Sequence, residues 1–541
     1  MPAPTPKPAP RSLSASIVVS GLAWSAPGGA PLFSGLGLAL GPERTGLVGR
    51  NGVGKTTLLR LITGELSPQA GTVAVQGRVA MLRQAVQVEG EETLADLFGV
   101  REALAVLARA EAGTASADDL AAADWTLEAR IVEALAQVGL EAEPGARLAA
   151  LSGGQRTRAG LAGLLLARPD FILLDEPTNN LDREGRRAVA DLLAAWRRGA
   201  VVVSHDRDLL EAMDAVVELT GLGATRYGGG WSLYRERKAL DLAAARRGLA
   251  EAERRVAGLA RDAQGAVERK ARKDGAGKRK AARGGQPRIL LGAMKRRAEA
   301  TGGDEARLAE RRREEALAAA AEARERIEVL QPFSAVLPPT GLAARKEVLR
   351  LDRVSAGYGP GRPVVEDFSL TLTGPERVAV CGPNGSGKTT LLGLVAGRIA
   401  PWSGEVRVFT PFAMLDQRVE ALDPALSIRD NFRRLNPEAD ENACRAALAR
   451  FMFRADAALQ PAGSLSGGQL LRAGLACVLG GPAPPPLLIL DEPTNHLDVE
   501  SLEVVEAGLA AYDGALLVVS HDEAFLKAVG VTRRVEMPGR R

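Results

Sequence analysis

The sequence has few of the residues that indicate disulfide-linked, zinc-binding or membrane-spanning proteins. Only three of its 541 residues are cysteine (Cys381, Cys444 and Cys477), and none of them has the CxxC spacing of a zinc module. So few cysteines favour a reducing compartment. No apolar run reaches the roughly 20 residues that a membrane-spanning helix needs; the best candidate, 161–174, is short and contains charged residues. We therefore expect a cytoplasmic protein without a membrane domain.

An excess of charge of one sign is also missing from the chain as a whole. The 70 Lys and Arg residues nearly balance 66 Asp and Glu, which leaves a net charge of +4. This balance alone does not indicate a nucleic-acid partner. Hydrophobic residues make up 46% and charged residues 25%, which excludes a mainly disordered or fibrous chain. The Pro-rich residues 1–11 are expected to form a disordered tail rather than a signal peptide.

The chain contains one series of motifs twice, in the same order. In both copies 30 residues separate the DEPT motif from the SHD motif. The repetition predicts two homologous domains, 12–230 and 347–541, with a connector at 231–346. The paired segments are 46–64 with 378–397 (GKTTLL), 151–162 with 465–476 (LSGGQ), 173–182 with 489–498 (LDEPTN), and 201–206 with 517–522 (VVSHD).

Continuous apolar runs within the repeats predict strands that are buried on both faces of a parallel sheet. Runs of this kind occupy residues 171–174 and 201–203 in the first copy, and 487–490 and 516–519 in the second. Helical patterns separate them, so each copy is expected to have an α/β fold.

Both copies contain the pattern G-x-x-x-x-G-K-[ST] of a phosphate-binding loop, between a strand-like run and a helix. Glycines let backbone N–H groups surround phosphate oxygens, and the helix N-terminus adds its positive dipole. Lys55 and Lys388 are expected to reach the β- and γ-phosphates, and Thr56 and Thr389 to ligate Mg²⁺. The remaining predicted ATP-binding residues of these loops are Gly49, Asn51, Gly52, Gly54, Thr57, Gly382, Asn384, Gly385, Gly387 and Thr390.

A pair of acids follows an apolar run in each copy. Asp175 and Asp491 suit the coordination shell of Mg²⁺. Glu176 and Glu492 are placed to orient or deprotonate the water that attacks ATP. These residues predict an ATP hydrolase with two active sites.

The motifs closely resemble those of the ABC ATPase family, in which LSGGQ is the signature. The resemblance implies that Gln84 and Gln417 sense Mg²⁺ and the γ-phosphate, and that His205 and His521 are switch histidines. Asp182 and Asp498 resemble the D-loop aspartates. Tyr358 and Trp24 resemble the aromatic residue that stacks on adenine, although Trp24 needs a one-residue gap to align and could equally be a packing residue.

In this family two domains pair head to tail, so that the signature of one domain covers ATP held by the other. The resemblance implies that Lys55 and Glu176 face the signature of the second copy, and that Lys388 and Glu492 face that of the first. The signature residues assigned to ATP binding are Ser152, Gly153, Gly154 and Gln155 in the first copy, and Ser466, Gly467, Gly468 and Gln469 in the second.

The connector has the pattern of two long helices that form an antiparallel hairpin with a glycine-containing tip. The tip, 269–297, carries a net charge of +11, and no aromatic residue occurs at 235–332. Without aromatic stacking platforms, we expect contact with phosphates and shape, as on structured RNA. The predicted RNA-binding residues are Arg269, Lys270, Arg272, Lys273, Lys278, Arg279, Lys280, Arg283, Arg288, Lys295, Arg296 and Arg297.

Two fused ATPase domains with such a connector resemble the ABC-F group, whose members act on ribosomes and direct the connector toward tRNA. An Ala- and acid-rich insertion at about 95–130 resembles a short form of the arm of that group, or reflects plain variation in loop length. The resemblance implies an ATP- and Mg²⁺-dependent protein that engages the ribosome, through rRNA and tRNA, in translation. A resistance factor that displaces antibiotics from ribosomes and a DNA-associated ATPase in repair or replication remain alternatives.

Overall fold

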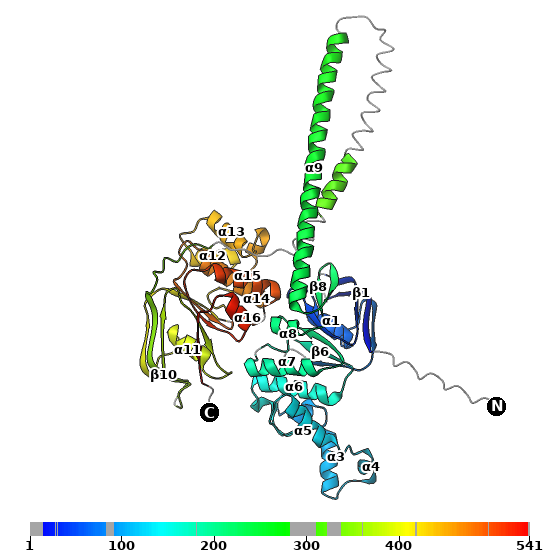
Figure 1. Ribbon diagram of the computed structural model, residues 1–541, viewed down its shortest axis with the longest axis vertical. Coiled ribbons are helices and arrows are strands. Elements are labelled where there is room, and N and C mark those ends of the chain that lie inside the picture. Colours follow the sequence, from blue (N-terminus) through cyan, green and yellow to red (C-terminus); the bar gives the residue numbers. More distant parts are fainter. Residues whose placement is uncertain are drawn as a thin grey trace, which may run out of the picture. The chain divides into compact units, whose positions relative to one another are not determined.

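The computed structural model describes residues 15–26, 29, 31–82, 91–179, 181–281, 310–321, 337–359, 361–416, 419–495 and 497–538 (Figure 1). The predicted tail at 1–11 lies outside these residues. The chain forms two compact units, one from Met1–Leu233 with Phe333–Arg541 and one from Tyr234–Pro332. The first unit contains both repeats, and the second contains most of the predicted connector.

The first repeat is built on a six-stranded sheet with the strand order β5-β6-β7-β3-β8-β9. Neighbouring strands run parallel from β5 to β8, whereas β9 pairs antiparallel with β8. Every residue of β6 and β7 is buried, as their continuous apolar runs predict. The strands are β3 (Arg44–Val48), β5 (Val79–Leu82), β6 (Phe171–Asp175), β7 (Gly199–Val203), β8 (Ala215–Thr220) and β9 (Gly223–Gly228).

A smaller antiparallel sheet packs its apolar side against the same core. It consists of β1 (Ser16–Ser25), β2 (Pro31–Leu40) and β4 (Ala70–Gln76), with β1 in the middle. Ile17, Leu22 and Phe33 are buried together with residues of β3, β6 and β7 in one cluster. The sheet therefore forms a second layer of the ATPase domain.

Helices of the first repeat connect the strands and carry the motifs at their N-termini. The segment 101–122 forms two helices, α3 and α4, where the second repeat passes directly from α12 (Ile428–Leu435) to α13 (Glu441–Arg450). The helices are α1 (Lys55–Ile62), α2 (Leu94–Leu97), α3 (Arg101–Glu111), α4 (Ala117–Ala122), α5 (Leu127–Gln137), α6 (Gly153–Ala167), α7 (Arg183–Ala195) and α8 (Arg207–Glu211), with a 3₁₀ turn at Leu148–Ala150.

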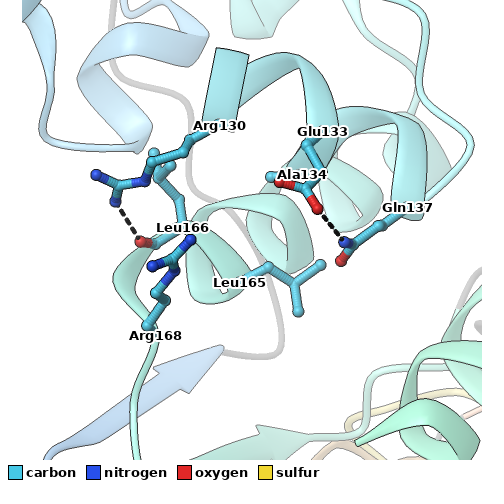
Figure 2. Close-up of a pocket in the computed structure, with 7 residues that line it drawn as sticks. All are labelled: Arg130, Glu133, Ala134, Gln137, Leu165, Leu166 and Arg168. Atoms are coloured by element: carbon cyan, nitrogen blue, oxygen red, sulfur yellow. Dashed lines mark hydrogen bonds between the residues drawn. The ribbon is translucent and has the colours of Figure 1, made fainter. Parts of the chain in front are cut away.

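The end of the insertion is fixed to the signature helix. Figure 2 shows Arg130 of α5 beside the end of α6, where its Nη2 donates a 3.1 Å hydrogen bond to the Leu166 carbonyl. Its Nη1 also donates to Asp124 at 2.8 Å. A pocket of about 200 Å³ lies between the two helices. None of the predicted ATP-site residues lines this pocket.

The second repeat has the same two layers. Its main sheet has the order β14-β15-β16-β12-β17, all parallel, and its smaller sheet the order β11-β10-β13. The strands are β10 (Glu347–Ala356), β11 (Val365–Thr373), β12 (Arg377–Cys381), β13 (Ser403–Val408), β14 (Phe412–Leu415), β15 (Leu487–Asp491), β16 (Ala515–Val519) and β17 (Arg533–Glu536). The helices are α11 (Lys388–Val395), α12 (Ile428–Leu435), α13 (Glu441–Arg450), α14 (Gly467–Leu479), α15 (Val499–Ala511) and α16 (Glu523–Ala528), with 3₁₀ turns at Ala455–Leu459 and Ala462–Ser464.

The connector begins with α9 (Trp231–Ala281), a single helix of 51 residues (Figure 1). It continues through residues 269–281, so this part of the predicted tip is helical despite its glycines; residues 282–297 lie outside the described structure. Residues 310–321 form a further helical segment, inside the second predicted helix. Among the described residues, no helix is both long and apolar enough to span a membrane.

Candidate functional site

In each repeat the motifs meet at the carboxyl edge of the parallel sheet. The strand before the phosphate loop, β3, lies next to β7, and β7 lies next to β6, whose last residue is Asp175. In the second repeat β12, β16 and β15 have the same arrangement, and β15 ends at Asp491. Sheets of this type bind ligands outside the carboxyl ends of their strands.

The glycines of the phosphate loops are required by their backbone geometry. Gly49 and Gly382 have φ values of 152° and 145°, and a Cβ atom would come within 2.4 Å of the Leu219 carbonyl oxygen and 2.6 Å of that of Met537, respectively. Gly54 and Gly387 also have positive φ and form the N-caps of α1 and α11. Both loops therefore deliver the chain to a helix N-terminus, where backbone N–H groups favour phosphate.

The two loop lysines lie folded against their own loops. Lys55 Nζ donates to the carbonyl oxygens of Gly49 and Arg50 at 2.6 and 3.2 Å. Lys388 Nζ donates to those of Gly382 and Pro383 at 2.8 and 3.1 Å. Burial lowers the pKa of both ammonium groups, with nearby carboxylates opposing the shift. A buried lysine held over a phosphate loop is suited to pair with phosphate oxygens.

The predicted metal residues form hard oxygen donor sets in both repeats. Thr56 Oγ1 donates a 2.7 Å hydrogen bond to Asp175 Oδ2, so the hydroxyl and the carboxylate point at the same place. Asp491 Oδ1 is buried without a hydrogen-bond partner among the described residues. Burial raises the pKa of both aspartates, which a cation would oppose. Hydroxyl and carboxylate oxygens fit Mg²⁺. The predicted third ligands, Gln84 and Gln417, lie outside the described residues.

The predicted bases have a strained backbone and lie beside the switch histidines. Glu176 and Glu492 have φ values of 49° and 45°, in the left-handed region that non-glycine residues rarely adopt. Glu176 Oε1 is 3.1 Å from His205 Nε2, and Glu492 Oε1 is 3.4 Å from His521 Nε2. These atoms are close but are not aligned for hydrogen bonds. The two histidine Nε2 atoms and Glu176 Oε1 are buried and have no hydrogen-bond partner in the described structure.

Burial shifts the pKa values of these pairs in opposite directions. It raises the pKa of Glu492 to about 7 against the opposing effect of Lys388, and it lowers the pKa of His521 to about 4. In the first repeat burial likewise raises the pKa of Glu176 and lowers that of His205. The imidazoles are therefore neutral near pH 7, while the carboxyls are tuned toward that pH, as suits a general base.

The signature motifs form helix N-termini. Ser152 caps α6 and Ser466 caps α14, each in a capping box with the glutamine three residues later. Ser152 Oγ accepts from the Gln155 backbone N–H at 3.3 Å, and Ser466 Oγ accepts from that of Gln469 at 3.4 Å. Each hydroxyl retains its own proton for donation to a ligand.

The two predicted adenine-stacking residues, Tyr358 and Trp24, differ in their exposure. Tyr358 is 68% exposed, and its hydroxyl accepts a 3.2 Å hydrogen bond from Thr390 Oγ1. Trp24 is half-buried against the core of the first repeat, which favours the packing alternative.

Of the predicted RNA-binding residues, Arg269 is on α9 at an exposed position, as is Arg272. Arg283, Arg288, Lys295, Arg296 and Arg297 lie outside the described residues.

The D-loop aspartate of the second repeat contacts the phosphate loop of the first. The Asn51 backbone N–H donates a 2.7 Å hydrogen bond to Asp498 Oδ2. One residue earlier, Arg50 forms an ion pair with Glu500, with Nη2 2.7 Å from Oε1. Arg207, after the switch motif, pairs with Glu506. Sequence reasoning missed both ion pairs, although each arginine replaces a residue of another type in the second copy, which was the available signal.

Comparisons with known proteins identify the family. The sequence model of the family described as "ABC transporter" matches residues 38–179 and 365–495, one match in each repeat. Over 532 residues the chain is 34% identical to the "Tylosin resistance ATP-binding protein TlrC" of Streptomyces fradiae, covering 91% of this chain and 92% of that protein. The chain belongs to the ABC-F group of ABC ATPases. As a member it is an ATP-binding enzyme that hydrolyses ATP.

Another ABC-F relative is the "Energy-dependent translational throttle protein EttA" of Mycobacterium tuberculosis H37Rv, 32% identical over 89% of this chain and 84% of that protein. Among solved structures, the archaeal ribosome recycling factor aABCE1, in complex with the stalk protein aP1, superposes with a TM-score of 0.57 at 18% identity. The superposition covers 95% of this chain and 87% of the matched chain in that structure. This likeness supports the tandem ABC fold; the α/β prediction with two P-loop domains is confirmed.

Proposed function

We propose that this ABC-F protein binds two ATP molecules at composite sites, hydrolyses them, and uses the pairing of its repeats to engage the ribosome. The observation that carries the proposal is the contact of Asp498 with the Asn51 backbone N–H at 2.7 Å, which joins one repeat to the phosphate loop of the other. A second repeat that contributes to the first loop makes ATP binding and repeat pairing mutually dependent.

The loop residues bind and orient the nucleotide. Lys55 and Lys388 exchange their hydrogen bonds to loop carbonyls for bonds to phosphate oxygens, and the N-termini of α1 and α11 hold the same phosphates. Thr56 with Asp175, and Thr389 with Asp491, would hold Mg²⁺, which when bound would neutralise charge at the phosphates. The signatures of the opposite repeats, with Ser466 and Ser152, close over the two nucleotides.

Glu176 and Glu492 orient a water molecule and accept its proton during attack on the γ-phosphate. Burial holds their pKa values above the usual range, so that each carboxylate accepts a proton more readily than a solvated one. The adjacent neutral imidazoles of His205 and His521 can donate a hydrogen bond to the γ-phosphate without adding charge to the buried site.

The relatives and the charge of the connector support the ribosome as partner. One relative carries the name of a translational throttle protein, and the segment 269–297 has a net charge of +11. The rest of the chain has a net charge of −7, so the positive charge is concentrated in the connector. Such a segment binds RNA phosphates in a salt-dependent manner. This function places the protein in the cytoplasm, where ATP-driven pairing of the repeats controls its stay on the ribosome.

Co-sedimentation with ribosomes tests the proposal. A Glu176→Gln/Glu492→Gln variant binds ATP without hydrolysing it, and we expect it in the ribosomal pellet with ATP but not with ADP. Lys55→Ala/Lys388→Ala in the same background is the matched control, because it weakens ATP binding and should return the protein to the supernatant. Absence of the Gln variant from the pellet with ATP at low salt would refute ribosome engagement.

Antibiotic resistance is a second candidate, favoured by the 34% identity to a tylosin resistance protein over 92% of that protein. In this case the connector would displace a drug from the ribosome. Expression in a sensitive host should then raise the inhibitory concentration of a macrolide several-fold, and the Glu-to-Gln variant should not. An unchanged inhibitory concentration for all ribosome-targeting drugs would argue against the resistance function and leave translation as the remaining role.

A further inference from the structure

The short helix α8, directly after the switch motif of the first repeat, is bound to the second repeat at its first residue. Arg207 donates two hydrogen bonds to Glu506 of α15, Nη1 to Oε1 at 2.8 Å and Nη2 to Oε2 at 2.9 Å. The side chains are 16% and 12% exposed, so this bidentate pair is largely desolvated. Close charge pairs of this kind hold interfaces more strongly than exposed ones.

The same helix contacts the root of the connector. The Arg207 guanidinium lies 5.9 Å from the ring centroid of Trp231, the first residue of α9, within the range of a cation–π interaction. Glu211, at the other end of α8, accepts a 2.7 Å hydrogen bond from the Ser232 backbone N–H. Both ends of α8 therefore hold the first turn of α9, and Trp231 is buried there.

The second repeat does not repeat this arrangement. At the position of Arg207 it has Glu523, which pairs with Arg534 of its own repeat at 2.6 Å. At the position of Glu506 the first repeat has Ala190, which carries no charge. Within the described part of the chain, the residues that link the repeats to α9 thus have no counterparts at the equivalent positions Glu523 and Ala190.

We propose that Arg207 is a positioning residue that couples the pairing of the two repeats to the first turn of α9. The inference rests on the proposed function in that ATP drives this pairing. The planar guanidinium of Arg207 donates two hydrogen bonds to the Glu506 carboxylate and also lies 5.9 Å from the centroid of the Trp231 ring. A lysine ammonium group lacks this planar shape and would not make both contacts in the same way. When Glu506 withdraws, the guanidinium loses its counter-ion in a desolvated position and has to turn toward water. Trp231 then loses its cation, and the α9 root loosens.

Amide hydrogen exchange of the full-length protein tests this coupling. In the Glu176→Gln/Glu492→Gln background, we expect ATP to slow exchange in the first two turns of α9 by about tenfold. Arg207→Ala should abolish this slowing while ATP still protects the phosphate loops. Glu500→Ala is the matched control, because it breaks another ion pair between the repeats, that with Arg50, from a position on α15 outside the phosphate loop, and it should keep the response. Glu523→Ala should also keep it.

The charge-swapped variant Arg207→Glu/Glu506→Arg distinguishes the pairing of the two repeats from the coupling of that pairing to α9. It should restore ATP-dependent pairing but not protection of α9, since a carboxylate then lies near the indole. Should Arg207→Ala misfold, Glu506→Ala removes the hydrogen-bond acceptor and leaves Arg207 in place. Full ATP-dependent protection of α9 in Arg207→Ala or Glu506→Ala would overturn the proposal. The proposal would also fail if ATP gave no protection of α9 in the Glu176→Gln/Glu492→Gln protein itself. Neither result depends on ribosome binding, which co-sedimentation judges separately.

Discussion

The two repeats contain the same ATP-site chemistry but differ in the side chains that join them. Lysine, threonine, aspartate, glutamate and histidine occupy equivalent positions in both, and the proposed bases Glu176 and Glu492 share the same left-handed backbone conformation. At the interface the first repeat contributes Arg50 and Arg207, and the second contributes Glu500 and Glu506. The residues proposed to act on ATP are thus the same in both repeats, whereas the residues that join the repeats differ and match only in charge across the interface.

This one-sided arrangement also distinguishes partners. Pairing between the second repeats of two molecules would bring Glu506 toward Glu523, since Glu523 occupies the position of Arg207. Opposed like charges disfavour such a contact. The charge pattern therefore favours pairing of first with second repeat.

Replacing both glutamates tests their assignment as the proton acceptors of the two sites. We expect Glu176→Gln and Glu492→Gln together to lower steady-state phosphate release by at least about 100-fold, because the water loses its proton acceptor. Glu184→Gln, an exposed glutamate on α7, is the control and should leave the rate unchanged. A double variant that hydrolyses ATP at the parent rate would show that the bases are assigned wrongly.

The acid limb of the pH profile tests the tuning of Glu492. Burial raises its pKa to about 7, and only the ionised carboxylate accepts a proton. The residual kcat/KM of a Glu176→Gln variant should therefore fall about tenfold per pH unit below 7 and level off above it. His521, with its pKa lowered to about 4, stays neutral in this range. A profile flat between pH 5 and 8 would rule out Glu492 as the titrating base.

The two predicted adenine-stacking residues should differ when replaced by alanine. Trp24→Ala removes a ring that packs against the core, and we expect a loss of about 2 kcal/mol in the free energy of unfolding. Tyr358→Ala should leave stability nearly unchanged, because Tyr358 is 68% exposed, and should raise KM for ATP about fivefold. Urea unfolding and steady-state kinetics measure the two effects. A KM effect from Trp24→Ala at unchanged stability would restore its stacking role.

The exposed ion pair between the repeats should contribute least. Arg50 is 52% exposed, so Arg50→Ala should lower the free energy of unfolding by at most about 0.5 kcal/mol. Raising the salt concentration should remove even this difference. Thermal unfolding at two salt concentrations measures this difference. Glu184→Ala is the control, because Glu184 occupies in the first repeat the position that Glu500 occupies in the second. A salt-resistant loss above 2 kcal/mol would mean that the pair is desolvated.

Much of this architecture could be predicted from the sequence because the signals are local. The apolar runs of β6 and β15, and the glycines before Lys55 and Lys388, each specify their own backbone. The pairs Arg50–Glu500 and Arg207–Glu506 join residues 450 and 299 positions apart. Comparing the repeats reveals that these positions differ but does not reveal which residues meet. The helical continuation of α9 through Gly275 and Gly277 was also missed, since glycine weakens a helix without ending it.

Chemical crosslinking across the interface tests whether ATP joins the two repeats. Cysteines at Arg50 and Glu500, in the Glu176→Gln/Glu492→Gln background with Cys381→Ser, can be linked by a short bifunctional thiol reagent. Cysteines at Pro383 and Glu184 report on the equivalent positions of the other site. We expect ATP to raise the yield of both crosslinks above that found with ADP. Crosslinking that is equal with ATP and ADP at both positions would contradict it.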